Sequence, residues 1–170
     1  MRAAQVTRVQ NGLDVTRELP ADVPRIFRAL SDPDELSLWW GPPGYPMVSC
    51  TIDFRPGGVW HYLLRGELTK EEFWARAVYT EIVEPTRLRY WETPSDSAGG
   101  VAAGRPPADV AINLAPAPDV ATTTLTIRIR HRSALDRDRA LKLGIESGLS
   151  RALDALDLLL VADSSERQHP

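Results

Sequence analysis

The hydrophobic pattern of this chain changes its period once, and that change constrains the fold more than any other feature. Between residues 45 and 130, apolar and polar residues alternate as they do in half-buried strands, whereas from about residue 135 to 162 apolar residues recur at helical spacing. The alternating runs cover residues 48–54, 59–65, 73–83, 87–93, 110–114 and 122–130. Closely linked strands followed by one long amphipathic helix predict an α+β fold, in which the helix packs its apolar face on an antiparallel sheet.

The residues before this region add one strand and two short helices. Residues 13–19 alternate like the later strands, and residues 23–30 carry apolar side chains at helical spacing after the candidate N-cap Asp22. A second short helix ends near Leu38. We therefore expect a curved antiparallel sheet wrapped around a long C-terminal helix, with two short helices after the first strand. The length of 170 residues predicts a single domain over residues 1–170, with a core of about 13–162 and flexible termini.

The composition is that of an ordinary globular protein, with 43% hydrophobic and 25% charged residues. The formal net charge of −3 gives no electrostatic reason to expect nucleic acid or an anionic membrane as a partner. The longest apolar run, residues 158–162, is far too short to span a bilayer, and the first residues lack the apolar segment of a secretion signal. The single cysteine, Cys50, excludes an internal disulfide and suits a reducing compartment, so we expect a cytoplasmic protein.

Few residues offer the groups that metal or nucleophilic chemistry needs. The three histidines, His61, His131 and His169, are scattered along the chain, and a metal site needs several converging ligands. Cys50 shares the phase of apolar neighbours and is expected to be a buried, inert thiol, while His61 alternates with Trp60 and faces outward. The sequence contains no Gly-x-Ser-x-Gly elbow and no phosphate-binding glycine loop that leads into a helix. We therefore predict no catalytic residue, no metal and no cofactor.

Four segments occur in an order that points to a known family. They are VTRELPA at residues 15–21, WWGP at 39–42, DFRPGGVW at 53–60 and EPTRLRY at 84–90. Together they resemble the START-like (SRPBCC, helix-grip) superfamily, and within it the proteins homologous to the activator of the heat-shock-protein ATPase. The resemblance runs from about residue 13 to 160. It implies a helix-grip fold with a cavity between the sheet and the C-terminal helix, and bacterial relatives that bind or process diverse apolar molecules.

Two details of the family pattern bear on the site. The DFRPGGVW segment is interpreted as a tight turn that braces two strands rather than as a catalytic motif. Relatives often carry Gly-Trp in the last helix, whereas this chain has Gly148 followed by Leu149. Because Leu149 lies on the apolar stripe of that helix, the smaller side chain is expected to leave a larger cavity.

The apolar faces of the predicted elements supply the candidate pocket wall. Trp60 and Tyr62 share one strand face, Tyr90 shares the phase of Leu88, and Arg76 is a polar group that could orient a ligand. Each of these residues also suits an ordinary core, because core and pocket wall are the same surface in a helix-grip fold. The predicted ligand-binding residues are Trp40, Trp60, Tyr62, Arg76, Tyr90, Ile145 and Leu149.

Three functions are compatible with this pattern. The first is a protein that binds a small apolar or aromatic molecule between the sheet and the C-terminal helix, with no catalysis assigned. The second is an enzyme of the polyketide cyclase/aromatase kind acting in the same cavity, for which Tyr90, Glu72 and Arg76 form the plausible acid–base set. The third is an interaction module or chaperone cofactor. The expected partner is a small hydrophobic molecule, and the sequence leaves open whether the protein is a monomer or a homodimer.

Overall fold

The structure is a computed structural model that describes residues 2–119 and 121–166. Its elements, in chain order, are β1 (Gln5–Val9), β2 (Gly12–Leu19), α1 (Val23–Ser31), α2 (Pro33–Trp39), β3 (Met47–Ile52), β4 (Val59–Arg65), β5 (Glu72–Val83), β6 (Arg87–Ser95), β7 (Ala108–Pro116), β8 (Thr123–Arg130), α3 (Ala134–Lys142) and α4 (Ile145–Glu166). The strands form one sheet in the order β1-β2-β8-β7-β6-β5-β4-β3, and every neighbouring pair is antiparallel. The predicted α+β fold is confirmed.

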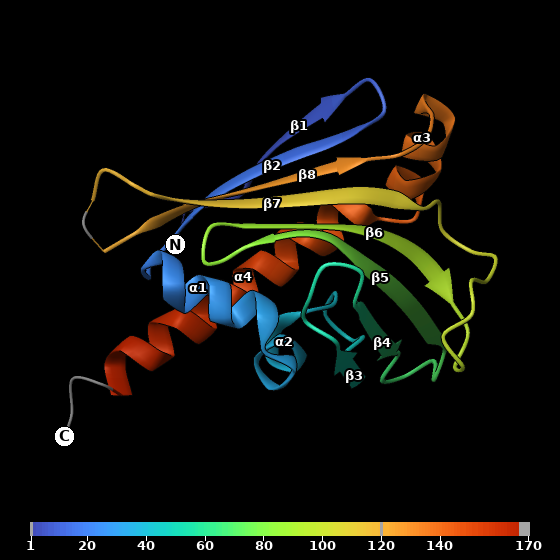
Figure 1. Cartoon of the computed structure of the whole chain (residues 1–170), viewed down its shortest axis with the longest axis horizontal. Helices are drawn as coiled ribbons and strands as arrows, with labels where there is room; N and C mark the ends of the chain where they lie inside the picture. Colours follow the sequence, from blue (N-terminus) through green and yellow to red (C-terminus); the bar gives the residue numbers. More distant parts are fainter. Residues whose placement is uncertain (1, 120, 167–170) are drawn as a thin grey trace.

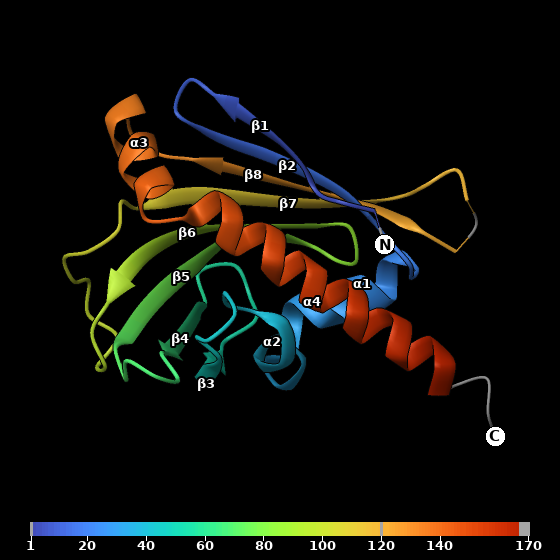
Figure 2. The same cartoon turned by 180° about the vertical axis from the view of Figure 1, so that it is seen from behind.

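The sheet curves around α4, which crosses one of its faces from the α3 end to the α1 end (Figures 1 and 2). We call this covered side the inner face of the sheet and the opposite side the outer face. Alternation decides which side chains reach the inner face: in β8, Leu125, Ile127 and Ile129 are buried, whereas Arg128 between them is exposed. Leu153 and Leu156 of α4 are buried in the same core. Within the described residues, no helix is long and apolar enough to cross a membrane.

A buried ion cluster fixes the C-terminal half of α4 to the sheet. Arg17 of β2 is in phase with apolar residues of the inner face, and its side chain is completely buried. Its guanidinium donates from Nη1 to Asp154 Oδ1 at 2.6 Å and from Nη2 to Asp157 Oδ2 at 3.0 Å. Closer to the C-terminal end of α4, Asp163 pairs with Arg25 of α1. The N-terminal end of α4 is joined to the sheet by the exposed Arg8–Glu146 pair.

The two short helices begin at the capping residues that the sequence indicates. The Asp22 side chain accepts a hydrogen bond from the Arg25 backbone N–H at 2.9 Å, and Asp32 accepts one from Asp34 at 2.8 Å. Trp39, the last residue of α2, is buried and donates from Nε1 to the Ala29 carbonyl at 2.9 Å. This bond locks α2 against α1 and fixes the point from which the next residue, Trp40, projects.

Three details of the expected element order differ. Residues 5–9 form the edge strand β1, so the two helices follow the second strand; most of its side chains remain exposed, which is why the region shows no clear alternation. The helix expected over residues 135–162 is split into α3 and α4, because Gly144 adopts a φ of +84° that ends α3. Strand β6 continues to Ser95. Of the termini expected to be flexible, residues 1 and 167–170 lie outside the described part of the chain.

Candidate functional site

Four aromatic side chains gather on the inner face of β4, β5 and β6. Trp60 stacks on Tyr62 with ring centroids 4.6 Å apart, Tyr90 lies 5.8 Å from Trp60, and Tyr79 lies 6.2 Å from Tyr90. We call these four residues the aromatic cluster; each is at most 2% exposed. They meet because antiparallel register places the inward positions of neighbouring strands opposite one another, for example Tyr79 opposite Tyr90.

A polar cluster borders the aromatic cluster. The Tyr62 hydroxyl donates to Glu92 Oε2 at 2.9 Å, and Arg105 Nη2 donates to Glu92 Oε1 at 2.6 Å and to the Tyr62 hydroxyl oxygen at 3.2 Å. Burial, reinforced by the Glu92 charge, raises the pKa of Tyr62, so its hydroxyl stays protonated and remains a donor. The Glu92 carboxylate raises the pKa of Arg105. The Arg105 side chain is 40% exposed and that of Glu92 is 12% exposed, so this cluster joins the interior to solvent.

Two polar atoms of the aromatic cluster have no conventional hydrogen-bond partner within the described part of the chain. They are the Tyr79 hydroxyl oxygen and Trp60 Nε1, and both are buried. The Trp60 N–H faces only the Cys50 thiol, a weak acceptor. Burial raises the pKa of Tyr79, Tyr90 and Cys50, so all three stay protonated near neutral pH. Unsatisfied polar atoms in a core are uncommon and point to a bound molecule or water.

Six of the seven predicted ligand-binding residues lie on the inner side of the molecule. Trp40 contacts the aromatic cluster edge-on, with its ring centroid 5.1 Å from Trp60 and 6.3 Å from Tyr62. Ile145 and Leu149, in the N-terminal half of α4, are partly buried and pack against the same core. Trp60, Tyr62 and Tyr90 belong to the aromatic cluster itself.

Arg76 is not part of this group. Its neighbours Ala75 and Ala77 are buried on the inner face, so alternation directs Arg76 to the outer face, where it lies opposite His61 of β4. Glu72 is exposed and pairs with Arg65 at 2.7 Å. The acid–base set of Tyr90, Glu72 and Arg76 is therefore not assembled, and the interpretation of Arg76 as an inward-facing group is corrected.

Arg105 takes the place that the sequence suggested for Arg76. It lies between β6 and β7, in a segment rich in proline, glycine and alanine with no periodicity, so no pattern could show where its side chain points. Glu92, in contrast, is placed by the sequence pattern, because it follows Tyr90 by two residues in one strand and therefore shares its face.

The histidine between two residues of the aromatic cluster does not face that cluster. His61 lies on the outer face, where its ring stacks on Trp74 at 4.8 Å and Nε2 lies 3.0 Å from the Asp96 carbonyl oxygen. Ser95 Oγ is 3.3 Å from the same nitrogen, but a carbonyl only accepts, so Nε2 carries the proton there and cannot act as a base toward Ser95. Among the described residues, no three His, Cys, Asp or Glu side chains are grouped to hold a metal ion.

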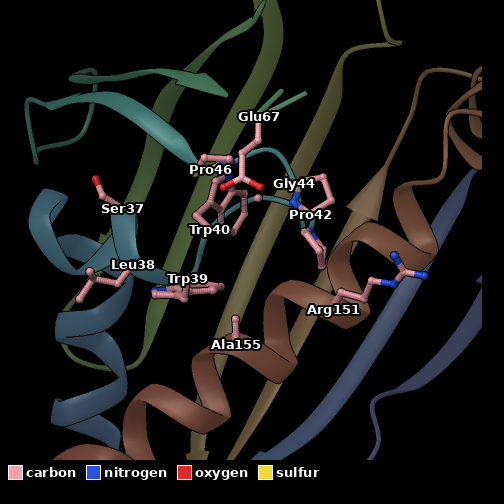
Figure 3. A pocket seen from close by; sticks show the side chains of 12 residues that line it. Ser37, Leu38, Trp39, Trp40, Pro42, Gly44, Pro46, Glu67, Arg151 and Ala155 are labelled. Carbon is pink, nitrogen blue, oxygen red and sulfur yellow. The ribbon is translucent and has the colours of Figure 1, made fainter. Parts of the chain in front are cut away.

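A surface pocket of about 210 Å³ lies between α2, the segment that follows it, and α4. Its lining residues are Ser37, Leu38, Trp39, Trp40, Gly41, Pro42, Pro43, Gly44, Pro46, Glu67, Arg151 and Ala155. We call it the loop pocket. Figure 3 shows Trp39 and Trp40 on one side of it and Ala155 and Arg151 of α4 on the other, with the Arg151 guanidinium pointing away from Trp40. A second hollow, of about 330 Å³, lies on the outer face beside Trp91 and the Arg89–Asp109 ion pair.

Comparison with known proteins agrees with this architecture. Residues 20–160 match the sequence profile of the family described as Activator of Hsp90 ATPase homolog 1-like protein. A crystal structure of a Mycobacterium smegmatis protein is similar with a TM-score of 0.84 and 26% identity, covering 94% of this chain and 97% of that one. A solution structure from Arthrobacter aurescens has a TM-score of 0.85 and 24% identity, covering 93% and 91% of the two chains.

A more distant structure carries the family name itself. It is the AHSA1 protein of Silicibacter pomeroyi, with a TM-score of 0.70 and 19% identity over 89% of this chain and 99% of that one. No curated protein sequence matches the chain. Since the profile spans most of the chain and the fold agrees with it, the protein belongs to the family of Hsp90 ATPase activator homologues, within the START-like superfamily.

Proposed function

We propose that the protein binds a small, mostly apolar aromatic molecule between the sheet and the N-terminal half of α4. The observation that carries this proposal is the polar cluster of Tyr62, Glu92 and Arg105 beside four buried aromatic rings. Desolvating a carboxylate and a guanidinium costs free energy, and this pair, unlike the buried pairs of Arg17, does not hold α4 on the sheet. Charged groups at the border of an apolar interior are typical of ligand sites, where they fix the orientation of a bound molecule.

The unpartnered atoms indicate the chemistry that the ligand offers. The Trp60 N–H can only donate, and the buried Tyr79 hydroxyl can donate or accept. A buried polar group without a partner costs about 1–3 kcal/mol, so a carbonyl or hydroxyl on a rigid ring system would recover free energy by bonding to these atoms. The aromatic faces would supply the rest, because apolar burial contributes about 25 cal/mol per Å².

A binding screen with matched variants tests this function. Fatty acids, flavonoids and polyketide-like aromatics are titrated into the protein while tryptophan fluorescence and melting temperature are recorded, since a ligand that binds the native state raises the melting temperature. We expect planar aromatics with carbonyl groups to respond and saturated fatty acids to respond less. Arg105→Gln should weaken binding of the responding compound, whereas Arg76→Gln, the same change on the outer face, should leave it unaltered. A panel without any response, or equal effects of the two variants, would contradict the proposal.

Catalysis in the same site is the second candidate, because Glu92 offers a carboxylate next to the aromatic cluster. As a general base it would have to accept a proton while its two oxygens are hydrogen-bonded to Tyr62 and Arg105. Conversion of a responding compound into a new product, abolished by Glu92→Gln with binding retained, would establish an enzyme. Unchanged recovery of the compound after prolonged incubation would leave a binding protein.

A further inference from the structure

One side chain belongs both to the loop pocket and to the interior. Trp40 lines the loop pocket, and its ring also contacts Trp60 and Tyr62 of the aromatic cluster. The half-buried Trp40 indole is therefore a wall of the surface pocket (Figure 3) and a neighbour of the candidate site inside. If that ring moved aside, the loop pocket would open onto the Tyr62 hydroxyl.

The two adjacent tryptophans are attached differently. Trp39 is 2% exposed and its indole N–H is bonded to the Ala29 carbonyl, so it cannot move without disturbing α1 and α2. Trp40 is only partly buried, and its N–H faces the Tyr62 hydroxyl, a group of the candidate site itself. Displacing Trp40 therefore breaks contacts with the site and leaves the Trp39 anchor in place.

The segment that carries Trp40 rests on α4 at a residue without a side chain. A Cβ atom placed on Gly148 would lie 3.8 Å from Pro42 Cβ, so Pro42 packs directly over this glycine. Gly41 and Gly44 on either side of Pro42 adopt φ values of +110° and +83°. The ion pairs that fasten α4 involve Asp154, Asp157 and Asp163, all C-terminal to this contact.

At the N-terminal end of α4, the attachment is weaker. There, Arg8 pairs with Glu146 at 3.0 Å in an exposed position, where an ion pair contributes little. The contact between Pro42 and Gly148 therefore closes the site at the least firmly held part of the helix.

The other border of the site is chemically less suited to an apolar visitor. There the Arg105 guanidinium and the Glu92 carboxylate are joined by a 2.6 Å charge-assisted hydrogen bond, and a molecule passing between them would have to break it. The loop pocket is lined by indole and proline rings together with Ser37, Glu67 and Arg151, so an apolar molecule would contact ring faces there without first separating the Glu92–Arg105 pair.

We propose that the segment 40–46 is the entrance to the ligand site and that Trp40 is the side chain that closes it. This inference rests on the proposed function. A molecule first occupies the loop pocket, then passes into the aromatic cluster when Trp40 turns away and Pro42 lifts from Gly148. The seated molecule is enclosed again when both return.

A disulfide across the entrance tests this directly. The 3.8 Å separation of the Cβ positions matches the mean of natural disulfides, so Pro42→Cys with Gly148→Cys, in a Cys50→Ala background, should form a bond that holds the segment on α4. The probe is 8-anilinonaphthalene-1-sulfonate, and its binding is followed by stopped-flow fluorescence before and after reduction. Both single-cysteine variants serve as controls.

We expect oxidation to lower the association and dissociation rates together, each by about tenfold or more, while the dissociation constant changes little, because binding then requires a motion that the bond prevents. Reduction should restore both rates. Trp40→Ala provides the opposite perturbation and should raise both rates, with Leu158→Ala, an exposed residue of α4 that does not line the pocket, as its control.

The outcomes separate the two proposals. Equal rates in the oxidised and reduced protein, with the probe still bound, would overturn the entrance and leave the binding function intact. Faster binding in Arg105→Ala together with an unaffected disulfide variant would place the entrance at the polar cluster instead. No binding of the probe to the reduced protein would overturn both proposals.

Discussion

Arg17 holds α4 on the sheet, and removing its charge should cost more stability than any other single ion-pair change in the described chain. Its side chain is fully buried, and Asp157, one of its two partners, is only 5% exposed, whereas Asp154 is 46% exposed. Arg17→Met keeps the length of the side chain but leaves the Asp157 carboxylate buried without its cation. Breaking a buried pair in this way costs about 3–5 kcal/mol. Asp154→Asn should cost less than about 1 kcal/mol, because solvent already screens that carboxylate.

Urea unfolding of the variants, at constant m-value, measures these differences. The double variant Arg17→Met/Asp157→Leu provides the decisive comparison, since it removes both buried charges and should be more stable than Arg17→Met alone. A loss below about 1 kcal/mol in Arg17→Met, or equal losses in Arg17→Met and Asp154→Asn, would refute the view that an uncompensated buried charge dominates.

Three further outcomes are expected. Burial raises the pKa of the three tyrosines of the aromatic cluster above the ordinary value of 10.0. The free energy of unfolding should therefore not depend on these tyrosines below about pH 10, and it should fall above that pH because the unfolded chain ionises first. Urea unfolding across this range, with tyrosinate absorbance, checks this prediction. Gly58→Ala should cost about 2–3 kcal/mol in denaturant unfolding, because its Cβ would lie 1.9 Å from a backbone oxygen, while Gly57→Ala meets open space and should cost less despite its φ of +81°. For Leu149→Trp, the free energy of unfolding should stay within about 1 kcal/mol of the parent and ligand binding should weaken, since Leu149 is only partly buried at the loosely held end of α4. A loss of about 3 kcal/mol would mean that no spare volume exists beside Leu149.

Most of the fold could be predicted because the period of the hydrophobic pattern is a local property. In β7 and β8 the inward residues are buried and the outward residues are not, so the alternation is visible without knowing the neighbours. Two of the three differences from the expected element order lie where that signal is weak. Strand β1 is an edge strand with little to bury, and the break before α4 depends on one glycine, Gly144, inside an otherwise continuous helical pattern.

The candidate site was harder to predict, because its polar groups are set by contacts between segments far apart in the sequence. Arg76 and Arg105 show the difference. Arg76 lies in a regular strand between two buried alanines, so strict alternation in β5 assigns it to the outer face. A β-bulge in this strand could have reversed that direction. The register shift in the β5–β6 pairing lies after Arg76, at Tyr79, so the alternation at Arg76 is preserved.

Arg105 belongs to a segment without regular structure, and its position is decided by the pairing of β6 with β7 at one end and by the Glu92 carboxylate at the other. The charge of a residue does not reveal a site arginine in this sequence, because the chain holds many more arginines than a site could use. Arginines on the outer face also have acidic partners, as Arg89 has Asp109. What distinguishes Arg105 is that its partner lies on the inner face. An arginine recruited from a loop to a carboxylate beside a buried aromatic cluster serves no packing need of the strands that carry the cluster, which is the physical reason for the proposal that this place binds a ligand.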